Sequence, residues 1–383
     1  MNLKNKQPPT ISDGKVQVSI EQFNISEFKV LEEQWLQLEN VAKTSFFLSW
    51  KWIGCWLKTV ANGQKIYLVK AQKNNLIVGL GLFVEQNIIR HKLIPSKQWY
   101  LHRTGKEEKD QIWIENNGFL LSESVKNVVN SAIWDCLLAQ KNNVDEYIVY
   151  VAKKSSIDNL IIYNKKYNTV IENPEIGYKI PLTNLASLED YLTTRSKNTR
   201  QQFKQSLKHI SKQGTVNFSI IENIAEQIEL LENAKHWHLE KWNNTSTPSG
   251  FSNKEFNLFH NNIITTSHPS ANTTMAKLTL DNNLIGCLYC LTHEKKVYFY
   301  LSCFKPYADN KVKLGLIMHI LMIEWLISEN TRYSEYDFLA GDARYKSSLS
   351  TVKDEYLKLT LQRNTIKFLI ENKLRKFYQN LIK

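Results

Sequence analysis

One short segment carries most of the side chains in this chain that could do chemistry. Positions 336–346 read Tyr-Asp-Phe-Leu-Ala-Gly-Asp-Ala-Arg-Tyr-Lys, so an apolar stretch ends abruptly in acids, a glycine and basic residues. A carboxylate can take a proton from a nucleophile, and a lysine can contact a phosphate or carboxylate of a substrate. We therefore predict that Asp337, Asp342 and Lys346 are catalytic and that Tyr345 contacts the substrate.

The same side chains also have a structural explanation, which the sequence leaves open. Asp337 could hold the loop at Gly341 in place. Lys346 or Arg344 could form a simple ion pair with one of the nearby acids, and such a pair needs no ligand.

The flanking elements place this segment at the end of a buried strand. Residues 314–327 are almost continuously apolar and predict a mostly buried helix, which is too short to cross a bilayer. Residues 333–338 predict the strand that follows. Functional groups commonly gather at strand ends in α/β sheets, and the two acids of the segment stand at and beyond such an end.

A basic loop lies just before the predicted helix. Lys311, Lys313 and Gly315 stand where that helix begins, and free backbone N–H groups and the helix dipole favour an anion at such a position. We predict that these three residues bind an anionic cofactor. The alternative is that the two lysines are ordinary surface residues.

Further candidates lie on one predicted helix and one predicted strand. His238 and Trp242 are one helical turn apart and could line a substrate groove with His238 as a base, although packing with a satisfied hydrogen bond is the commoner role for such a histidine. Tyr300, in a tyrosine-rich strand, is a further predicted substrate contact. We predict no metal site, because no acid or cysteine stands at a characteristic distance from His236 and His238.

The stretch from residue 191 to residue 214 contains no acid. Its apolar residues fall on one stripe, and its basic residues fall on another at spacings of three and four, namely Lys197, Arg200, Lys204, Lys208 and Lys212. We predict a helix whose basic face steers an anionic substrate or cofactor, with Arg200 as a direct contact. A nucleic-acid binder would place such a face on phosphates, so an RNA partner is the alternative.

Composition indicates two folded domains in a reducing compartment. The chain has 383 residues, of which 43% are hydrophobic and 22% charged, so nearly all of it should fold, and two cores are the default at this length. The net charge of +12 favours an anionic partner without saying which. Five cysteines in apolar settings predict reduced core residues, with Cys287 and Cys290 on opposite faces of one strand. The N-terminus lacks the apolar core of a signal peptide, so we expect a cytoplasmic protein.

The two halves of the chain repeat one order of elements. Each half has helices, then two strands across an asparagine-rich turn, then more helix and strand. Residues 76–82 after Asn74-Asn75 parallel residues 284–289 after Asn282-Asn283. A weak internal duplication is predicted, with the second unit starting after Pro181.

With these features the chain resembles the bacterial acetyltransferases of the cellulose-biosynthesis CelD/BcsL type. Members of this family are tandem arrangements of two GNAT (acetyltransferase) folds and are related to the Fem peptidoglycan-bridge transferases. Three segments carry the resemblance, which are residues 45–52 with the hairpin after them, the basic helix with residues 238–242 and Phe251 beyond it, and residues 286–346. The resemblance covers residues 16–363.

The resemblance implies a fold class, a domain division and an activity. The implied fold is α/β (α+β), with two tandem GNAT-like domains, each a mixed, mainly antiparallel sheet flanked by helices. We expect a flexible leader at 1–15, an N-terminal domain at 16–180, a C-terminal acetyltransferase domain at 181–363 and an amphipathic helix at 364–383. The implied reaction moves an acyl group from acetyl-CoA or another acyl-CoA to an amino group of a sugar or cell-envelope polysaccharide precursor.

One departure and two alternatives accompany this resemblance. GNAT enzymes commonly hold the cofactor pyrophosphate with a basic residue and two nearby glycines, and here only Gly315 is present. A Fem-like transferase that uses aminoacyl-tRNA and a non-catalytic binding protein with a GNAT fold are the alternatives. The C-terminal helix carries basic side chains that could touch an acidic membrane, or it could pack on the second domain. The sequence leaves the oligomeric state open.

Overall fold

The chain alternates helices and strands over the residues that the computed structural model describes, which are 14–140, 144–157, 167–245, 247–307 and 309–381. The first half contains β1 (Gln17–Gln22), η1 (Ile25–Glu27), α1 (Phe28–Glu39), η2 (Phe46–Leu48), α2 (Trp50–Lys58), β2 (Ile66–Lys73), β3 (Leu76–Arg90), β4 (Ile94–Leu101), α3 (Glu107–Asp110), β5 (Leu120–Leu121), η3 (Glu123–Val125), α4 (Lys126–Ala139), β6 (Glu146–Lys153), α5 (Lys154–Ile157) and β7 (Tyr167–Pro181). The second half contains α6 (Leu188–Thr193), α7 (Lys197–Ser211), β8 (Val216–Ile221), α8 (Ile224–Trp242), η4 (Gly250–Ser252), α9 (Lys254–Thr265), β9 (Ala271–Leu280), β10 (Asn283–His293), β11 (Lys296–Phe304), α10 (Leu314–Ser328), η5 (Asn330–Arg332), β12 (Glu335–Ala340), α11 (Arg344–Leu349), β13 (Val352–Arg363) and α12 (Ile366–Leu381).

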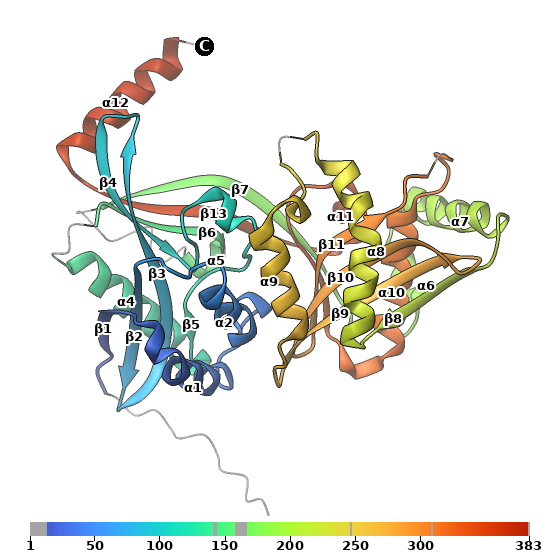
Figure 1. Cartoon of the computed structure of the whole chain (residues 1–383), viewed down its shortest axis with the longest axis horizontal. Helices are drawn as coiled ribbons and strands as arrows, with labels where there is room; N and C mark the ends of the chain where they lie inside the picture. The colour runs from blue at the N-terminus through green and yellow to red at the C-terminus, as the bar shows by residue number, and fades with distance from the viewer. Residues whose placement is uncertain (1–13, 141–143, 158–166, 246, 308, 382–383) are drawn as a thin grey trace, which may run out of the picture.

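The strands join into one 13-stranded sheet that runs through both halves (Figure 1). Its order is β1-β2-β3-β4-β6-β13-β7-β12-β11-β10-β9-β8, with β5 paired to β3. The pairs β4–β6 and β11–β12 are parallel, and the other pairs along the sheet are antiparallel. The predicted mixed, mainly antiparallel sheet is therefore confirmed.

The two halves exchange their last strands. The first half ends with β7, which pairs with β12 of the second half from Glu335–Pro181 to Ala340–Gly177. The second half ends its sheet with β13, which pairs with β6 of the first half. Because β7 and β13 also pair with each other, the exchange fuses two sheets into one. The predicted boundary at 180/181 falls at the end of β7 and stays a prediction.

Helices cover both faces of the sheet, and one core crosses the junction of the halves (Figure 1). On one face α1 and α2 of the first half meet α8 and α9 of the second, and the rings of Trp52 and Phe259 lie 4.7 Å apart between their centroids. On the other face α4 covers the first half, and α6, α7 and α10 cover the second. A large apolar side chain contributes about 2 kcal/mol when it is fully buried, so this shared core favours one assembled unit.

The element order agrees with the predicted duplication. The series β1-α1-α2-β2-β3-β4-α4-β6-α5-β7 matches β8-α8-α9-β9-β10-β11-α10-β12-α11-β13 in type and in sheet position. Both turns have two residues in the left-handed region, Asn74 and Asn75 in one and Asp281 and Asn282 in the other. Both hairpins also have an irregular register beside an equivalent glycine, Gly79 or Gly286.

One helix was predicted in the acid-free stretch 191–214, but this stretch contains the end of one helix and the whole of a second. α6 ends at Thr193, and α7 begins after Ser196. The Ser196 hydroxyl accepts a hydrogen bond from the Thr199 N–H at 3.1 Å and so starts a new helix. The Ser187 hydroxyl caps α6 in the same way and accepts a hydrogen bond from the Asp190 N–H at 3.1 Å.

Two more features differ from the sequence-based expectation. β7 was not predicted, because its polar and proline-containing sequence lacks the apolar alternation of a half-buried strand. The described part of α12 lies against the first half instead of packing on the second, since Glu371 binds Arg90 of β3 with an Nη2–Oε1 distance of 2.7 Å. The predicted leader lies almost entirely outside the described residues. Among those residues, no helix is both long and apolar enough to cross a bilayer.

A buried carboxylate helps to fix the junction of the halves. Glu39 in α1 accepts the Trp50 N–H at 2.9 Å, and its other oxygen lies 3.1 Å from Nε2 of His293 in β10. The imidazole of His268 lies 3.5 Å away. Burial alone would raise the pKa of Glu39, but the two imidazoles and the Trp50 N–H outweigh it and lower the pKa to about 2.

We predict that Glu39→Gln lowers the free energy of unfolding by about 2 kcal/mol at pH 7, because a charge-assisted network is replaced by neutral hydrogen bonds. A carboxylate whose pKa is depressed stabilises the fold fully above its unfolded value of 4.5 and loses that contribution as the pH falls toward 2. In urea titrations, the difference in the free energy of unfolding between wild type and Glu39→Gln should therefore shrink below pH 4.5. The variant Glu33→Gln, which changes an exposed neighbour, should unfold with the same free energy as wild type. A difference for Glu39→Gln that does not depend on pH would contradict this account.

Candidate functional site

The candidate site lies where β11 and β12 separate. These parallel strands pair at only three positions, Lys296–Glu335, Val297–Tyr336 and Tyr298–Asp337. Just after the last pair, Leu339 adopts a φ of +64° and donates its N–H to Oδ1 of Asp337 at 2.7 Å. This bend holds the buried Asp337 carboxylate at the point where the strands diverge.

A segment of the first half bridges this opening. Ala340 of β12 donates its N–H to Oε2 of Glu115 at 2.7 Å, and the Tyr300 hydroxyl of β11 donates to the Ile112 carbonyl. The next residue, Asn116, accepts from the Tyr356 hydroxyl of β13 at 2.8 Å. Backbone and side-chain groups at the open strand edges are thus satisfied by a loop from the other half.

Glu115 and Lys346 bind the same residue at the opening. Ala340 donates its N–H to Glu115, and its carbonyl accepts a hydrogen bond from Nζ of Lys346 in α11 at 2.6 Å. Burial raises the pKa of the Glu115 carboxyl, and burial lowers the pKa of the Lys346 amine. The two pKa values move toward each other, so transfer of a proton between the two groups costs less free energy than it would in water.

The pKa of Asp337 lies close to neutral pH. Burial raises its pKa to about 6, although the Leu339 N–H and the charge of Lys179 pull in the opposite direction. Lys179 forms ion pairs with two other acids, since its Nζ lies 2.9 Å from Asp354 and 3.4 Å from Glu335. A carboxylate with a pKa near 6 is mostly ionised at pH 7 and still basic enough to accept a proton.

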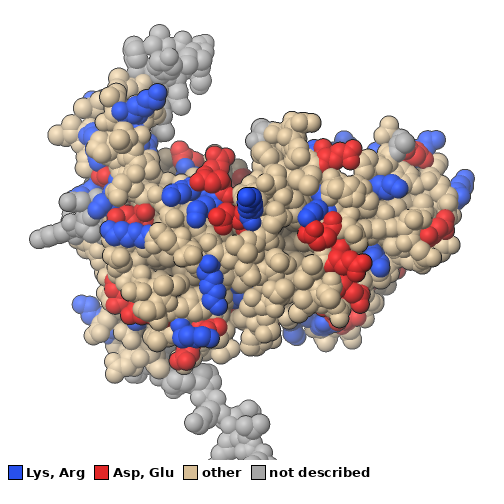
Figure 2. All heavy atoms as spheres, viewed as in Figure 1, with Lys and Arg blue, Asp and Glu red and all other residues tan. Residues whose placement is uncertain are grey.

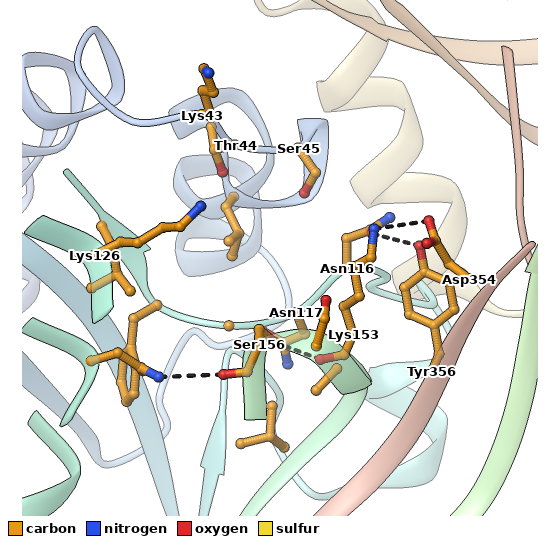
Figure 3. A pocket seen from close by; sticks show the side chains of 18 of the residues that line it. Lys43, Thr44, Ser45, Asn116, Asn117, Lys126, Lys153, Ser156, Asp354 and Tyr356 are labelled. Atoms are coloured by element: carbon orange, nitrogen blue, oxygen red, sulfur yellow. Dashed lines mark hydrogen bonds and ion pairs between the residues drawn. The ribbon is translucent and has the colours of Figure 1, made fainter. Parts of the chain in front are cut away.

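A cavity of about 430 Å³ has Asp337 among the residues that line it. Figure 3 shows other side chains of its wall, among them Lys43, Asn116 and Tyr356. Both halves line it, with Lys43, Thr44, Ser45, Asn116, Asn117, Lys126, Lys153 and Ser156 from the first and Lys179, Tyr298, Glu335, Asp337, Asp354 and Tyr356 around the exchanged strands. Among the described residues that line it, three buried polar atoms have no hydrogen-bond partner, namely Oγ1 of Thr44, Oγ of Ser45 and Nδ2 of Asn116. Buried polar atoms are rarely left unpaired, so this cavity suits a polar ligand.

The predicted catalytic residues are partly brought together. Asp337 and Lys346 share the opening of β12, and Asp337 also faces the cavity. Asp342 is exposed and accepts the Tyr178 hydroxyl at 2.7 Å. His238 hydrogen-bonds to Ser249 at 2.8 Å, does not line this cavity, and has a pKa that burial lowers to about 4.

The predicted cofactor loop lies away from the cavity. Lys311 and Lys313 are exposed, and the Lys313 N–H binds the Ser206 hydroxyl of α7 at 2.8 Å. No side chain caps the first turn of α10, in which Gly315 lies. Lys311 and Lys313 come just before this helix N-terminus, and neither side chain forms an ion pair with another described residue, so these residues would suit the phosphates of an acyl-CoA.

The predicted substrate contacts have mixed surroundings. Tyr300 lies at the opening, while Tyr345 stacks on the buried His319 with 5.5 Å between the ring centroids. Trp242 is 37% exposed at the end of α8. Arg200 donates to the carbonyls of Thr193 and Arg195 and so stabilises the C-terminus of α6. The roles of all these residues stay predictions.

Sequence reasoning missed Glu115, Lys179 and Tyr356. Glu115 lies in an irregular loop, and β7, which carries Lys179, was not predicted. The one available signal was an apolar stretch, 112–114, that ends in an acid and two asparagines before Gly118. In the described ranges, no group of histidine, cysteine and acidic side chains is placed to hold a metal ion.

Comparison with known proteins supports the acyltransferase prediction. Residues 197–347 match the model of an acetyltransferase (GNAT) domain, so the chain contains such a domain and is an acyltransferase by this match. The segment spans the opening of β11 and β12 and includes Asp337 and Lys346. A search of curated proteins finds no match.

Solved structures share the fold at low sequence identity. The crystal structure of FemX has a TM-score of 0.56 and 10% identity, and the match covers 91% of this chain and 99% of that one. A conserved protein of unknown function from Bacteroides thetaiotaomicron has a TM-score of 0.52 and 10% identity, with 90% of this chain and 100% of that one covered. These likenesses extend over both halves and, with the GNAT domain, confirm the predicted fold class.

We predict that Asp337→Asn raises the free energy of unfolding by about 1–3 kcal/mol at pH 8, because the variant no longer buries a charge there. A carboxyl whose pKa rises from 3.8 to about 6 on folding destabilises the fold increasingly between those values and fully above them. The amide can still accept the Leu339 N–H. Denaturant titrations should show a higher free energy of unfolding for Asp337→Asn than for wild type at pH 8 but not at pH 4. The variant Asp135→Asn, at an exposed position, should match wild type at both pH values. A loss of stability in Asp337→Asn at both pH values would refute the raised pKa of Asp337.

Proposed function

We propose that this chain is an N-acyltransferase of the CelD/BcsL type that moves an acyl group from acetyl-CoA to an amino group of a sugar or other envelope-polysaccharide precursor. One observation carries the proposal. Asp337, Glu115 and Lys346 stand together where β11 and β12 separate, and Asp337 faces a cavity that both halves line. Titratable groups with shifted pKa values beside a cavity are typical of active sites.

The chemistry of the reaction matches these groups. When bound, the thioester supplies an acyl carbonyl that the acceptor amine attacks, with the CoA thiol as leaving group. A protonated amine is not a nucleophile, so Asp337 accepts the proton, directly or through water. Lys346 and Glu115 can hold or return a proton at the same opening, because their pKa values lie closer together than in water.

The cavity also favours the proposed class of acceptor. The unpartnered polar atoms of Thr44, Ser45 and Asn116 can bond to hydroxyl and amide groups of a sugar. Lys43 and Lys126 at its wall would attract an anionic precursor. In this proposal the donor phosphates bind Lys311, Lys313 and the first turn of α10, and the domain division at 180/181 separates two GNAT-like units.

We predict that the protein releases free CoA thiol when it is mixed with acetyl-CoA and an amino-sugar acceptor such as a UDP-linked glucosamine. Asp337→Asn should lower kcat/KM by about 100-fold or more, as expected for loss of a general base, and Lys346→Met should also lower it. The surface variant Asp135→Asn should keep wild-type activity. Thiol release that is absent with every amine, or unchanged in Asp337→Asn, would contradict the proposal.

A Fem-like transferase that uses aminoacyl-tRNA is the second candidate, and one observation favours it. Lys197, Lys204 and Lys208 of α7 and Lys212 just after it are all exposed, and none of them forms an ion pair within the described part of the chain. Such a face can bind phosphates. Against this candidate, basic and acidic side chains are interspersed over the face that Figure 2 shows, without a continuous basic field.

A gel shift with tRNA separates the two candidates. If tRNA is the donor, the wild-type chain should bind it with an affinity that falls steeply as salt rises, and Lys204→Glu with Lys208→Glu should abolish the shift. Reversing two exposed lysines elsewhere, Lys29→Glu with Lys106→Glu, should leave it in place. If both double variants lose tRNA binding equally, the lysines attract tRNA non-specifically, and the tRNA-dependent transferase is no longer supported. If neither tRNA nor acetyl-CoA binds, as judged by thermal shift, the non-catalytic alternative remains.

A further inference from the structure

A second cavity, of about 590 Å³, lies at the junction of the two halves. Lys51 of α2 lines it from the first half. The second half supplies the rest of the lining, which includes Ser267, Ser270, Thr273, Thr274, Thr292 and Glu294. No residue lines both this cavity and the one beside Asp337. The two are therefore separate sites.

Lys51 is buried without a partner. The residue is 3% exposed, and within the described residues no hydrogen bond or ion pair joins its Nζ to another group. Burial lowers the pKa of Lys51 to about 8, so the amine is still mostly charged at pH 7. A buried ammonium without a counter-ion is costly, and proteins usually pair such a charge.

The neighbouring protein groups do not supply the missing negative charge. The titratable group that acts on Lys51 is Cys55, on the next turn of α2, and it stays a neutral thiol because burial raises its pKa. Glu222 binds Arg332 with an Nη2–Oε1 distance of 3.0 Å, and Glu294 is exposed to solvent. Among the described residues no acid pairs with Lys51, so its charge is available to an anion that enters the cavity.

The remaining wall is rich in hydroxyl groups. Those of Thr273, Thr274 and Thr292 are already hydrogen-bonded within the protein. The side chains of Ser267 and Ser270 form no hydrogen bond among the described residues, and both line the cavity, with Ser267 exposed and Ser270 half-buried. The wall of the cavity thus carries one positive charge and two hydroxyls that can donate and accept hydrogen bonds.

We propose that this cavity binds a small oxyanion, a phosphate or carboxylate group on a hydroxyl-bearing molecule such as a sugar, with Lys51 as its counter-ion. The anion pairs with the Lys51 ammonium, and the hydroxyls of the ligand bond to Ser267 and Ser270. The site is distinct from the proposed acyltransferase centre. Because α2 belongs to the first half and β9 and β10 to the second, the occupied site links the halves.

The test is thermal denaturation and calorimetric titration of the full chain with four probes at pH 7, which are inorganic phosphate, glucose 6-phosphate, gluconate and glucose. Phosphate-bearing or carboxylate-bearing probes should raise the melting temperature of the wild-type protein, and neutral glucose should not. The stronger of the anionic probes identifies which oxyanion the site prefers. Lys51→Met should weaken its binding at least about tenfold, as expected for loss of a charge-assisted hydrogen bond. Lys58→Met, which removes an exposed lysine from the same helix, should leave binding unchanged.

A second measurement guards against a variant that fails to fold. Without ligand, Lys51→Met should melt at a higher temperature than wild type, because a buried unpaired charge is replaced by an apolar side chain of similar length. If no anionic probe raises the melting temperature of the wild-type protein, the proposal is overturned. It is also overturned if an anionic probe raises the melting temperature of Lys51→Met as much as that of wild type, because the anion would then bind elsewhere. Since no acyl donor is present, failure here is independent of failure of the proposed reaction.

Discussion

The hydrogen bonding of β7 with β13 is the constraint on which the rest of the molecule depends. Without it β6 and β12 would each end a half-sheet with an open edge, and open edges carry unpaired backbone groups. The exchange turns both into interior strands and joins one sheet from β1 to β8. It also fixes the registers Asp337–Lys179 and Lys179–Val352, so that charged residues far apart in sequence become neighbours. The charge network at Asp337 is thus a product of strand exchange.

The duplicated unit is used differently in the two halves. Each half has a parallel pair that opens after three matched positions, β4 with β6 and β11 with β12. The loop after α3 reaches both openings, since Asn117 bonds to Val151 of β6, and Glu115 bonds to Ala340 of β12. A polar side chain of one half therefore enters the other half's opening. This asymmetry explains how two similar folds can yield one cluster of acid and base groups.

Local rules predicted most elements but could not predict how they assemble. The hairpin turns at Asn74-Asn75 and Asp281-Asn282 were predictable because asparagine tolerates the left-handed conformation. Asp337 and Lys346 were predicted as catalytic residues because a run of acidic and basic residues follows a buried strand, and their catalytic role stays a prediction. Glu115 was not predicted, because its role arises from a contact across 225 positions of the chain. β7 was missed for a related reason, since pairing on both sides, and not its own apolar pattern, holds it in the sheet.

The two cavities differ in how the charges beside them are balanced. Burial raises the pKa of Asp337 to about 6, and the acids and lysines around it partly offset one another, so its proton can be exchanged near neutral pH. Lys51 has no acid within ion-pair distance among the described residues, and its charge cannot be offset by moving a proton to a neighbour. A balanced network suits chemistry in which protons move. A single unbalanced charge suits binding, because the free energy gained on pairing it is available only to a ligand that carries the opposite charge.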